Sequence, residues 1–143
     1  MAYTKGWIVN VNNRHRLVLS GILYNERMMT MNFVIRKADR SDLTDILALT
    51  YSHPPVIDRA LAERFDCILS QTGYCLLAAF MNGRLAGLLS VSVTDGIGKQ
   101  FPFAVTDSGI IGGEFQGMGI ENALIAQAEY IAAEYGCKSI RCK

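Results

Sequence analysis

The sequence has 143 residues, of which 50% are hydrophobic and 19% charged, and its formal net charge is +1. This length and composition are typical of one compact domain, and they exclude a disordered chain and a collagen-like repeat. The near balance of charges gives no overall attraction to nucleic acid or to an anionic membrane. We therefore expect a single domain over residues 1–143 that binds neither.

No segment carries the pattern of a membrane span or a secretory leader. A span needs about 20 consecutive apolar residues, and the best runs here, residues 75–81 and 85–93, are much shorter. The N-terminal segment has no apolar stretch followed by a small-residue cleavage site. The four cysteines do not match zinc-ligand spacing. We expect a cytoplasmic protein with reduced thiols and no metal.

Residues 1–30 differ from the rest of the chain. They carry a net charge of +3, whereas residues 31–143 carry −2. Residues 7–11 and 17–24 are rich in strand-forming side chains, and the two asparagines that follow the first run favour a tight turn. We interpret residues 1–30 as an N-terminal β-hairpin or extension, and residues 32–143 as the core.

The core begins with a strand and two helices. Residues 33–36 form a short strand, and a helix follows that Asp39 or Ser41 caps and that ends near Thr50. A second amphipathic helix is predicted over residues 56–69, because apolar residues recur there at steps of three and four.

Two further strands and their turn follow. Residues 74–81 and 85–93 flank Asn82-Gly83, and both turn residues tolerate the left-handed conformation that a type I′ hairpin turn requires. Residues 101–111 are predicted as one more strand.

The last third of the core is a glycine-rich turn, a helix and a strand. Residues 112–119 contain four glycines, and a long helix starts at Ile120 and ends at Gly136. Residues 137–142 alternate like a short strand, and the intervening helix allows this strand to run parallel to the preceding one. These elements predict an α/β (α+β) fold with a mixed, mostly antiparallel central sheet flanked by helices.

The turn before this long helix is the strongest candidate site. A helix N-terminus offers unpaired N–H groups and a partial positive charge, and glycine lets an anion approach the backbone closely. Gln116-Gly117-Met118-Gly119-Ile120 occupies that place. The alternative is a loop whose glycines serve only to turn the chain. The early βαβ unit of a Rossmann fold and the Gly-Lys-Ser/Thr of a phosphate loop are both absent.

Three segments resemble one known family: NFVIRKADRSDLTDILAL (residues 32–49), the hairpin around Asn82-Gly83, and EFQGMGI (residues 114–120) followed by NALI. They are similar to the GNAT superfamily of acyl-CoA-dependent N-acyltransferases. The resemblance implies acetyl-CoA as co-substrate. The cofactor-binding residues that it implies are Ile110, Ile111, Gln116, Gly117, Met118, Gly119 and Ile120.

The family signature for coenzyme A is Gln or Arg, two residues, Gly, one residue, and Gly or Ala. With Gly117 and Gly119 as its two glycines, Glu114 stands at the first position. The resemblance further implies that the strand ending at Ile110-Ile111 diverges from residues 139–141. Pantetheine would enter that gap, and a backbone N–H around Ile110 would donate to the acyl oxygen.

Asp107, with Ser108 beside it, is the candidate catalytic residue. A carboxylate on this strand can accept a proton from an amine, directly or through water. The alternative is a polar residue in a bulge that faces solvent, because Asp is disfavoured inside strands. His53 lies in the loop that often covers the acceptor in this family, and its alternative is an exposed loop histidine.

The family fold normally continues with a helix, whose tyrosine often protonates the leaving thiolate, and with two more strands. Residues 1–24 look similar to that final hairpin, and we expect them to complete the sheet beside residues 137–142. The alternative is an upstream extension, with Met31 near the true start. A homodimer is a further arrangement that would cover an exposed sheet edge.

The resemblance implies an N-acetyltransferase that moves an acetyl group directly to a primary amine of a small molecule or peptide. A non-catalytic coenzyme A-binding or regulatory domain is the alternative. A domain with this fold and no ligand is the third, and it would be favoured if Glu114 pointed into the pyrophosphate site.

Overall fold

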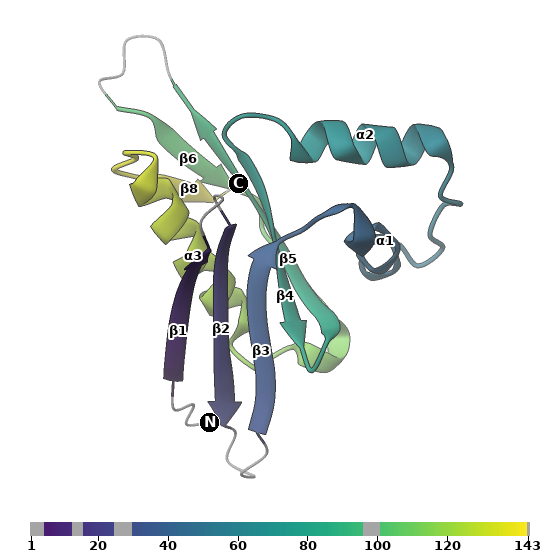
Figure 1. Cartoon of the computed structure of the whole chain (residues 1–143), viewed down its shortest axis with the longest axis horizontal. Coiled ribbons are helices and arrows are strands. Elements are labelled where there is room, and N and C mark those ends of the chain that lie inside the picture. Colours follow the sequence, from purple (N-terminus) through teal and green to yellow (C-terminus); the bar gives the residue numbers. More distant parts are fainter. Residues whose placement is uncertain (1–4, 13–15, 25–29, 96–100, 143) are drawn as a thin grey trace.

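The computed structural model describes residues 5–12, 16–24, 30–95 and 101–142, and it describes the backbone alone at 5–12, 16–24, 30–32 and 142. One mixed sheet runs in the order β1-β2-β3-β4-β5-β6-β8, and β7 also pairs with β5 (Figure 1). The strands are β1 (Lys5–Asn12), β2 (Arg16–Tyr24), β3 (Thr30–Lys37), β4 (Tyr74–Met81), β5 (Arg84–Thr94), β6 (Phe103–Thr106), β7 (Ile110–Ile111) and β8 (Ile140–Cys142). The helices are α1 (Leu43–Thr50), α2 (Arg59–Leu69) and α3 (Ile120–Glu134), and the short 3-10 turns are η1 (Arg40–Asp42) and η2 (Gly113–Phe115). The predicted α/β fold with a mostly antiparallel sheet is confirmed.

Helices cover both faces of the sheet. Figure 1 shows α3 on the side opposite α1 and α2. The helix α3 packs its predicted apolar face into the larger core, where each fully buried side chain contributes about 1.5–3 kcal/mol. The smaller core lies between α1 and the other face of β4 and β5, where Ile46, Ala78 and Leu88 belong to one buried cluster. The members of the larger core that are least exposed are Phe33, Ile35, Leu77, Met81, Val91, Ile120 and Leu124.

The β4–β5 hairpin is confirmed with its predicted turn. Asn82 has φ 49° and Gly83 has φ 79°, so both turn residues are left-handed, as a type I′ turn requires. This tight connection fixes the register of the two central strands.

Helix capping decides where the first two helices begin. Asp39 accepts a hydrogen bond from Ser41 N (2.9 Å) and starts η1, from which α1 continues. The second helix begins at Arg59 and not at Val56, because the Asp58 side chain accepts a hydrogen bond from Leu61 N (2.8 Å).

The prediction of one continuous strand over residues 101–111 was wrong. Two strands, β6 and β7, both pair antiparallel with β5, and their registers differ by one residue. The pair Val91↔Thr106 belongs to the first register and Leu88↔Ile110 to the second. A β-bulge at residues 107–109 separates them, where Gly109 has φ +65°.

The N-terminal hairpin forms, but its predicted place in the sheet was wrong. β1 and β2 pair antiparallel, and β2 pairs with β3 from Leu19↔Ile35 to Tyr24↔Thr30. The hairpin therefore extends the edge opposite β8. The short connection to β3 accounts for this, since strands that are adjacent in the chain tend to pair.

The final strand is shorter than its predicted range, residues 137–142. β8 begins at Ile140 and runs parallel to β6, with Ala104↔Ile140 as the first pair. The parallel crossover through α3 is confirmed, but the strand alongside β8 is β6, not the Ile110-Ile111 segment.

Candidate functional site

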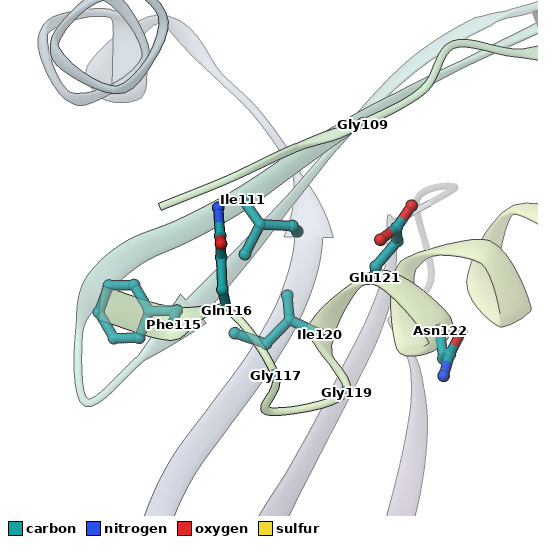
Figure 2. Close-up of a pocket in the computed structure, with 9 residues that line it drawn as sticks. All are labelled: Gly109, Ile111, Phe115, Gln116, Gly117, Gly119, Ile120, Glu121 and Asn122. Atoms are coloured by element: carbon teal, nitrogen blue, oxygen red, sulfur yellow. The ribbon is translucent and has the colours of Figure 1, made fainter. Parts of the chain in front are cut away.

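A cavity of about 710 Å³ lies between β7 and the N-terminus of α3. This volume is within the range of small-molecule sites. Figure 2 shows its lining residues, which come from the bulge, β7, the glycine-rich loop and the first turn of the helix. They are Gly109, Ile111, Phe115, Gln116, Gly117, Gly119, Ile120, Glu121 and Asn122.

The glycines leave the backbone of this cavity open. Gly117 and Gly119 have φ of +76° and +81°, and a Cβ on either would meet no atom within 4 Å. Ala123 N makes the first helical hydrogen bond, to Gly119 O at 3.1 Å. The N–H groups of residues 120–122 consequently precede the helical ladder, and the helix dipole adds a partial positive charge beside them. An open backbone beside the first N–H groups of a helix is an arrangement that suits an anion.

The edge of β7 forms the other wall. Gly112 N donates to Ala86 O (2.8 Å), and hydrogen-bonded positions alternate along an antiparallel strand. The N–H and C=O of Ile111 therefore point away from β5, while those of Ile110 face β5. Among the described strands, only β5 pairs with β7. This geometry favours Ile111 over the predicted Ile110 as the backbone donor. Of these two residues, Ile111 is the one that lines the cavity.

Two polar side chains reach toward β7. Figure 2 shows the Gln116 amide and the Glu121 carboxylate directed to the strand side of the cavity, whereas Asn122 extends the other way. Met118 and Phe115 pack against the larger core, as expected of loop residues, although Phe115 also lines the cavity. Among its lining residues Glu121 is the one with an ionisable side chain.

Glu114 lies outside this cavity. Its carboxylate pairs with Arg84 through two hydrogen bonds, Nη1 to Oε2 at 3.0 Å and Nη2 to Oε1 at 2.5 Å. This pair raises the pKa of the Arg84 guanidinium. Both residues line a second cavity of about 530 Å³, which α1 and the β4–β5 turn also border and which shares Ile111 and Phe115 with the first cavity. Glu114 is therefore not among the residues that line the cavity beside the glycines.

The structure instead favours a second register of the signature. Gln116 then takes the first position, Gly119 the fourth and Glu121 the sixth, and all three line the cavity. The departure from the family pattern is therefore Glu121 in place of Gly or Ala, not Glu114. Sequence spacing did not separate the two registers. The helical start at Ile120, which places residues 121 and 122 in the first turn, is the signal that could have done so.

Asp107 sits in the bulge and ties it to β5. Its Oδ2 accepts from Ser90 Oγ at 2.6 Å, and its Oδ1 accepts from the N–H groups of Ser90 and Gly109, both at 3.2 Å. The Asp107 N–H in turn donates to Ser90 O (3.3 Å). The bulge alternative is therefore observed, and one of its hydrogen bonds joins Asp107 to a residue that lines the cavity. Ser108 is exposed beside it.

Tyr74, at the start of β4, belongs to the same polar cluster. Burial, followed by the negative charges of Asp107 and Cys75, raises the pKa of Tyr74, and a hydrogen bond with Ser90 lowers it. Sequence reasoning missed Tyr74 and Ser90, because they come from strands far from residue 107 in the chain.

Other candidate residues lie apart from the cavity. His53 is exposed in the connection between α1 and α2, and Tyr130 and Tyr135 are exposed on and after α3. Within the described ranges, no three His, Cys, Asp or Glu side chains gather closely enough to hold a metal ion. No helix among the described residues is long and apolar enough to cross a membrane.

Solved structures share this fold. The chain superposes on a transcriptional regulator from Bacillus halodurans C-125 with a TM-score of 0.70 and 21% identity, covering 78% of this chain and 81% of the other. Glucosamine-6-phosphate N-acetyltransferase from Arabidopsis thaliana gives 0.68 and 18% over 78% and 81%. The aminoglycoside antibiotic 6'-N-acetyltransferase AAC(6')-Ih from Acinetobacter baumannii gives 0.64 and 22% over 78% of each chain.

Comparison with curated protein sequences gave no significant match. The family model for acetyltransferases of the GNAT family matches residues 40–143, which include α1, α2, the central hairpin and the whole cavity. That match covers well over half of the chain. The chain therefore belongs to the acetyltransferase (GNAT) family.

Proposed function

We propose that this protein is an N-acetyltransferase that binds acetyl-CoA in the cavity between β7 and α3 and transfers the acetyl group directly to a primary amine. The observation that carries the proposal is the open backbone at Gly117 and Gly119, immediately before the first N–H groups of α3. Family membership supports an acyl-CoA co-substrate and an amine acceptor.

The cavity fits the coenzyme through its backbone. The pyrophosphate would accept hydrogen bonds from the amides at the start of α3, which Gly117 and Gly119 leave open because neither residue has a Cβ. Pantetheine would lie along β7 and pair with the N–H and C=O of Ile111. Binding therefore depends on dipoles and hydrogen bonds, because no lysine or arginine is among the residues that line this cavity.

The residues at the bulge end of the cavity would promote transfer. The amine nitrogen attacks the thioester carbonyl carbon, so that a nitrogen–carbon bond forms and the carbon–sulfur bond breaks. The sulfur leaves with the bonding electrons as the thiolate of coenzyme A, and it then takes a proton from water. Asp107 accepts the proton that the amine loses, and the Ile111 N–H stabilises the oxygen that gains charge.

Calorimetric titration with coenzyme A and acetyl-CoA, followed by thiol release across a panel of primary amines, tests the proposal. We expect binding of both ligands, and amine-dependent thiol release. Asp107→Asn should lower turnover about 100-fold, the low end for a general base, and leave coenzyme affinity unchanged. Asp95→Asn is the matched control, because Asp95 is an exposed carboxylate just after β5 that is among the lining residues of neither cavity.

Two results would contradict the proposal in different ways. Coenzyme binding without thiol release would favour the non-catalytic coenzyme A-binding domain. Thiol release that Asp107→Asn does not slow would keep the transferase and return Asp107 to a structural role in the bulge.

A further inference from the structure

We propose that Ser90 and Tyr74 are positioning residues of the transfer reaction, which hold the Asp107 carboxylate at the bulge end of the coenzyme cavity. This inference rests on the proposed function. It assigns a role to two residues on β4 and β5 that the coenzyme signature does not contain.

The geometry begins with the bulge. The strand register shifts across residues 107–109, so an aspartate side chain there would ordinarily be free to choose among rotamers. Ser90 removes that freedom, because its Oγ and its N–H donate to different oxygens of the Asp107 carboxylate, at 2.6 and 3.2 Å. A hydroxyl that donates to a carboxylate at this length makes a strong, charge-assisted hydrogen bond.

The same carboxylate is joined to the cavity wall. Oδ1 of Asp107 also accepts from Gly109 N at 3.2 Å, and Gly109 lines the cavity. The Asp107 side chain is nevertheless exposed, so an amine in solution can reach it. The Asp107 carboxylate, which would accept the proton, is thus hydrogen-bonded directly to Gly109, a residue that lines the proposed coenzyme site.

Tyr74 supports Ser90 from the neighbouring strand. In the β4–β5 ladder Tyr74 lies opposite Ser92, and Ser90 and Ser92 share one face of β5. The Tyr74 side chain is half-buried and lies diagonally across from Ser90 on this face. Burial first, and then the negative charge of Asp107, raises the pKa of Tyr74, which keeps the phenol neutral beside the carboxylate.

Serine variants separate positioning from simple packing. We expect Ser90→Ala to lower kcat about tenfold while the KM for acetyl-CoA stays unchanged, because the residue acts through Asp107 and does not touch the coenzyme. Ser90→Thr keeps the hydroxyl and should restore kcat. Ser92→Ala makes the same chemical change two residues along the same face, and it should leave kcat unchanged. Tyr74→Phe should also lower kcat, as Ser90→Ala does.

A further readout does not follow from stability alone. In a titration of phenol absorbance, with Tyr74→Phe subtracted to assign the signal, Asp107→Asn should lower the pKa of Tyr74, since it removes the negative charge that raises it. This titration needs neither substrate nor turnover.

The outcomes distinguish the two proposals. If thiol is released but Ser90→Ala behaves like Ser92→Ala, the positioning role is wrong and the transferase stands. The positioning role is also wrong if Ser90→Ala lowers only the melting temperature, or if Ser90→Thr fails to restore kcat. Coenzyme binding without any amine-dependent thiol release would overturn both.

Discussion

Replacing Glu121 by Gln should strengthen coenzyme binding. Glu121 is the ionisable residue lining the cavity, and it stands in the first turn of α3, where a pyrophosphate would bring two negative charges. Unit charges about 4 Å apart in water interact by about 1 kcal/mol. Removing the carboxylate should therefore favour binding by about 1–2 kcal/mol, which is about five- to thirtyfold in the dissociation constant.

The same substitution should slightly weaken the fold. A carboxylate near a helix N-terminus stabilises the helix by about 0.3–1 kcal/mol, and Gln loses that interaction. Affinity and stability are thus expected to move in opposite directions. Calorimetric titration with coenzyme A gives the first quantity, and thermal unfolding gives the second. Because the repulsion is between exposed charges, the gain in affinity should shrink at high salt.

Glu114→Gln is the matched control. It makes the same chemical change seven residues earlier, at a carboxylate that pairs with Arg84 and does not line the cavity. Its coenzyme affinity should stay within about twofold of the original chain, since its charge is already paired and lies in another cavity. Equal effects of Glu114→Gln and Glu121→Gln, or weaker binding by Glu121→Gln, would refute the placement of the pyrophosphate.

Three other predictions concern the loop, the thiols and the N-terminal hairpin. Gly117→Val should abolish coenzyme binding. Gly136, at the far end of α3, has a similar positive φ of +81°. Each substitution should therefore lower the free energy of unfolding by about 1–2 kcal/mol, but Gly136→Val should leave calorimetric binding intact. Burial raises the pKa of Cys75 to about 11, so its thiolate is scarce below about pH 10. Mass spectrometry after alkylation at pH 8 should therefore show the exposed Cys67 modified long before Cys75. A chain that begins at Met31 keeps every residue of the cavity but uncovers the edge of β3, so it should aggregate or lose cooperative unfolding; an unchanged melting temperature would contradict this.

The elements that could be predicted from the sequence are those with strong local signals. Asn82-Gly83 determines its own turn type, and the apolar spacing of α3 determines which face it buries. The glycine-rich loop was located for the same reason, since a strand, glycines and a helix start are consecutive in the chain.

The features that were missed depend on distant partners. The bulge requires Asp107 to bond with Ser90, which lies 17 residues earlier on another strand, and no local pattern encodes that pairing. The N-terminal hairpin was recognisable from its composition, but its pattern does not say which edge of the sheet it joins. Two glutamates flank the glycines, and only the folded cavity shows that Glu121 lines it and Glu114 does not.

Titration of the isotope-labelled protein with coenzyme A, followed by amide NMR, tests the central claim most directly. The amides of Gly109, Gly117, Gly119 and Glu121 should shift together and saturate with one affinity, because these residues line the first cavity and not the second. The amides of Arg84 and Glu114, in the second cavity, should change little. Shifts centred on Arg84 and Glu114, or no saturable shift at the start of α3, would contradict a coenzyme site between β7 and α3.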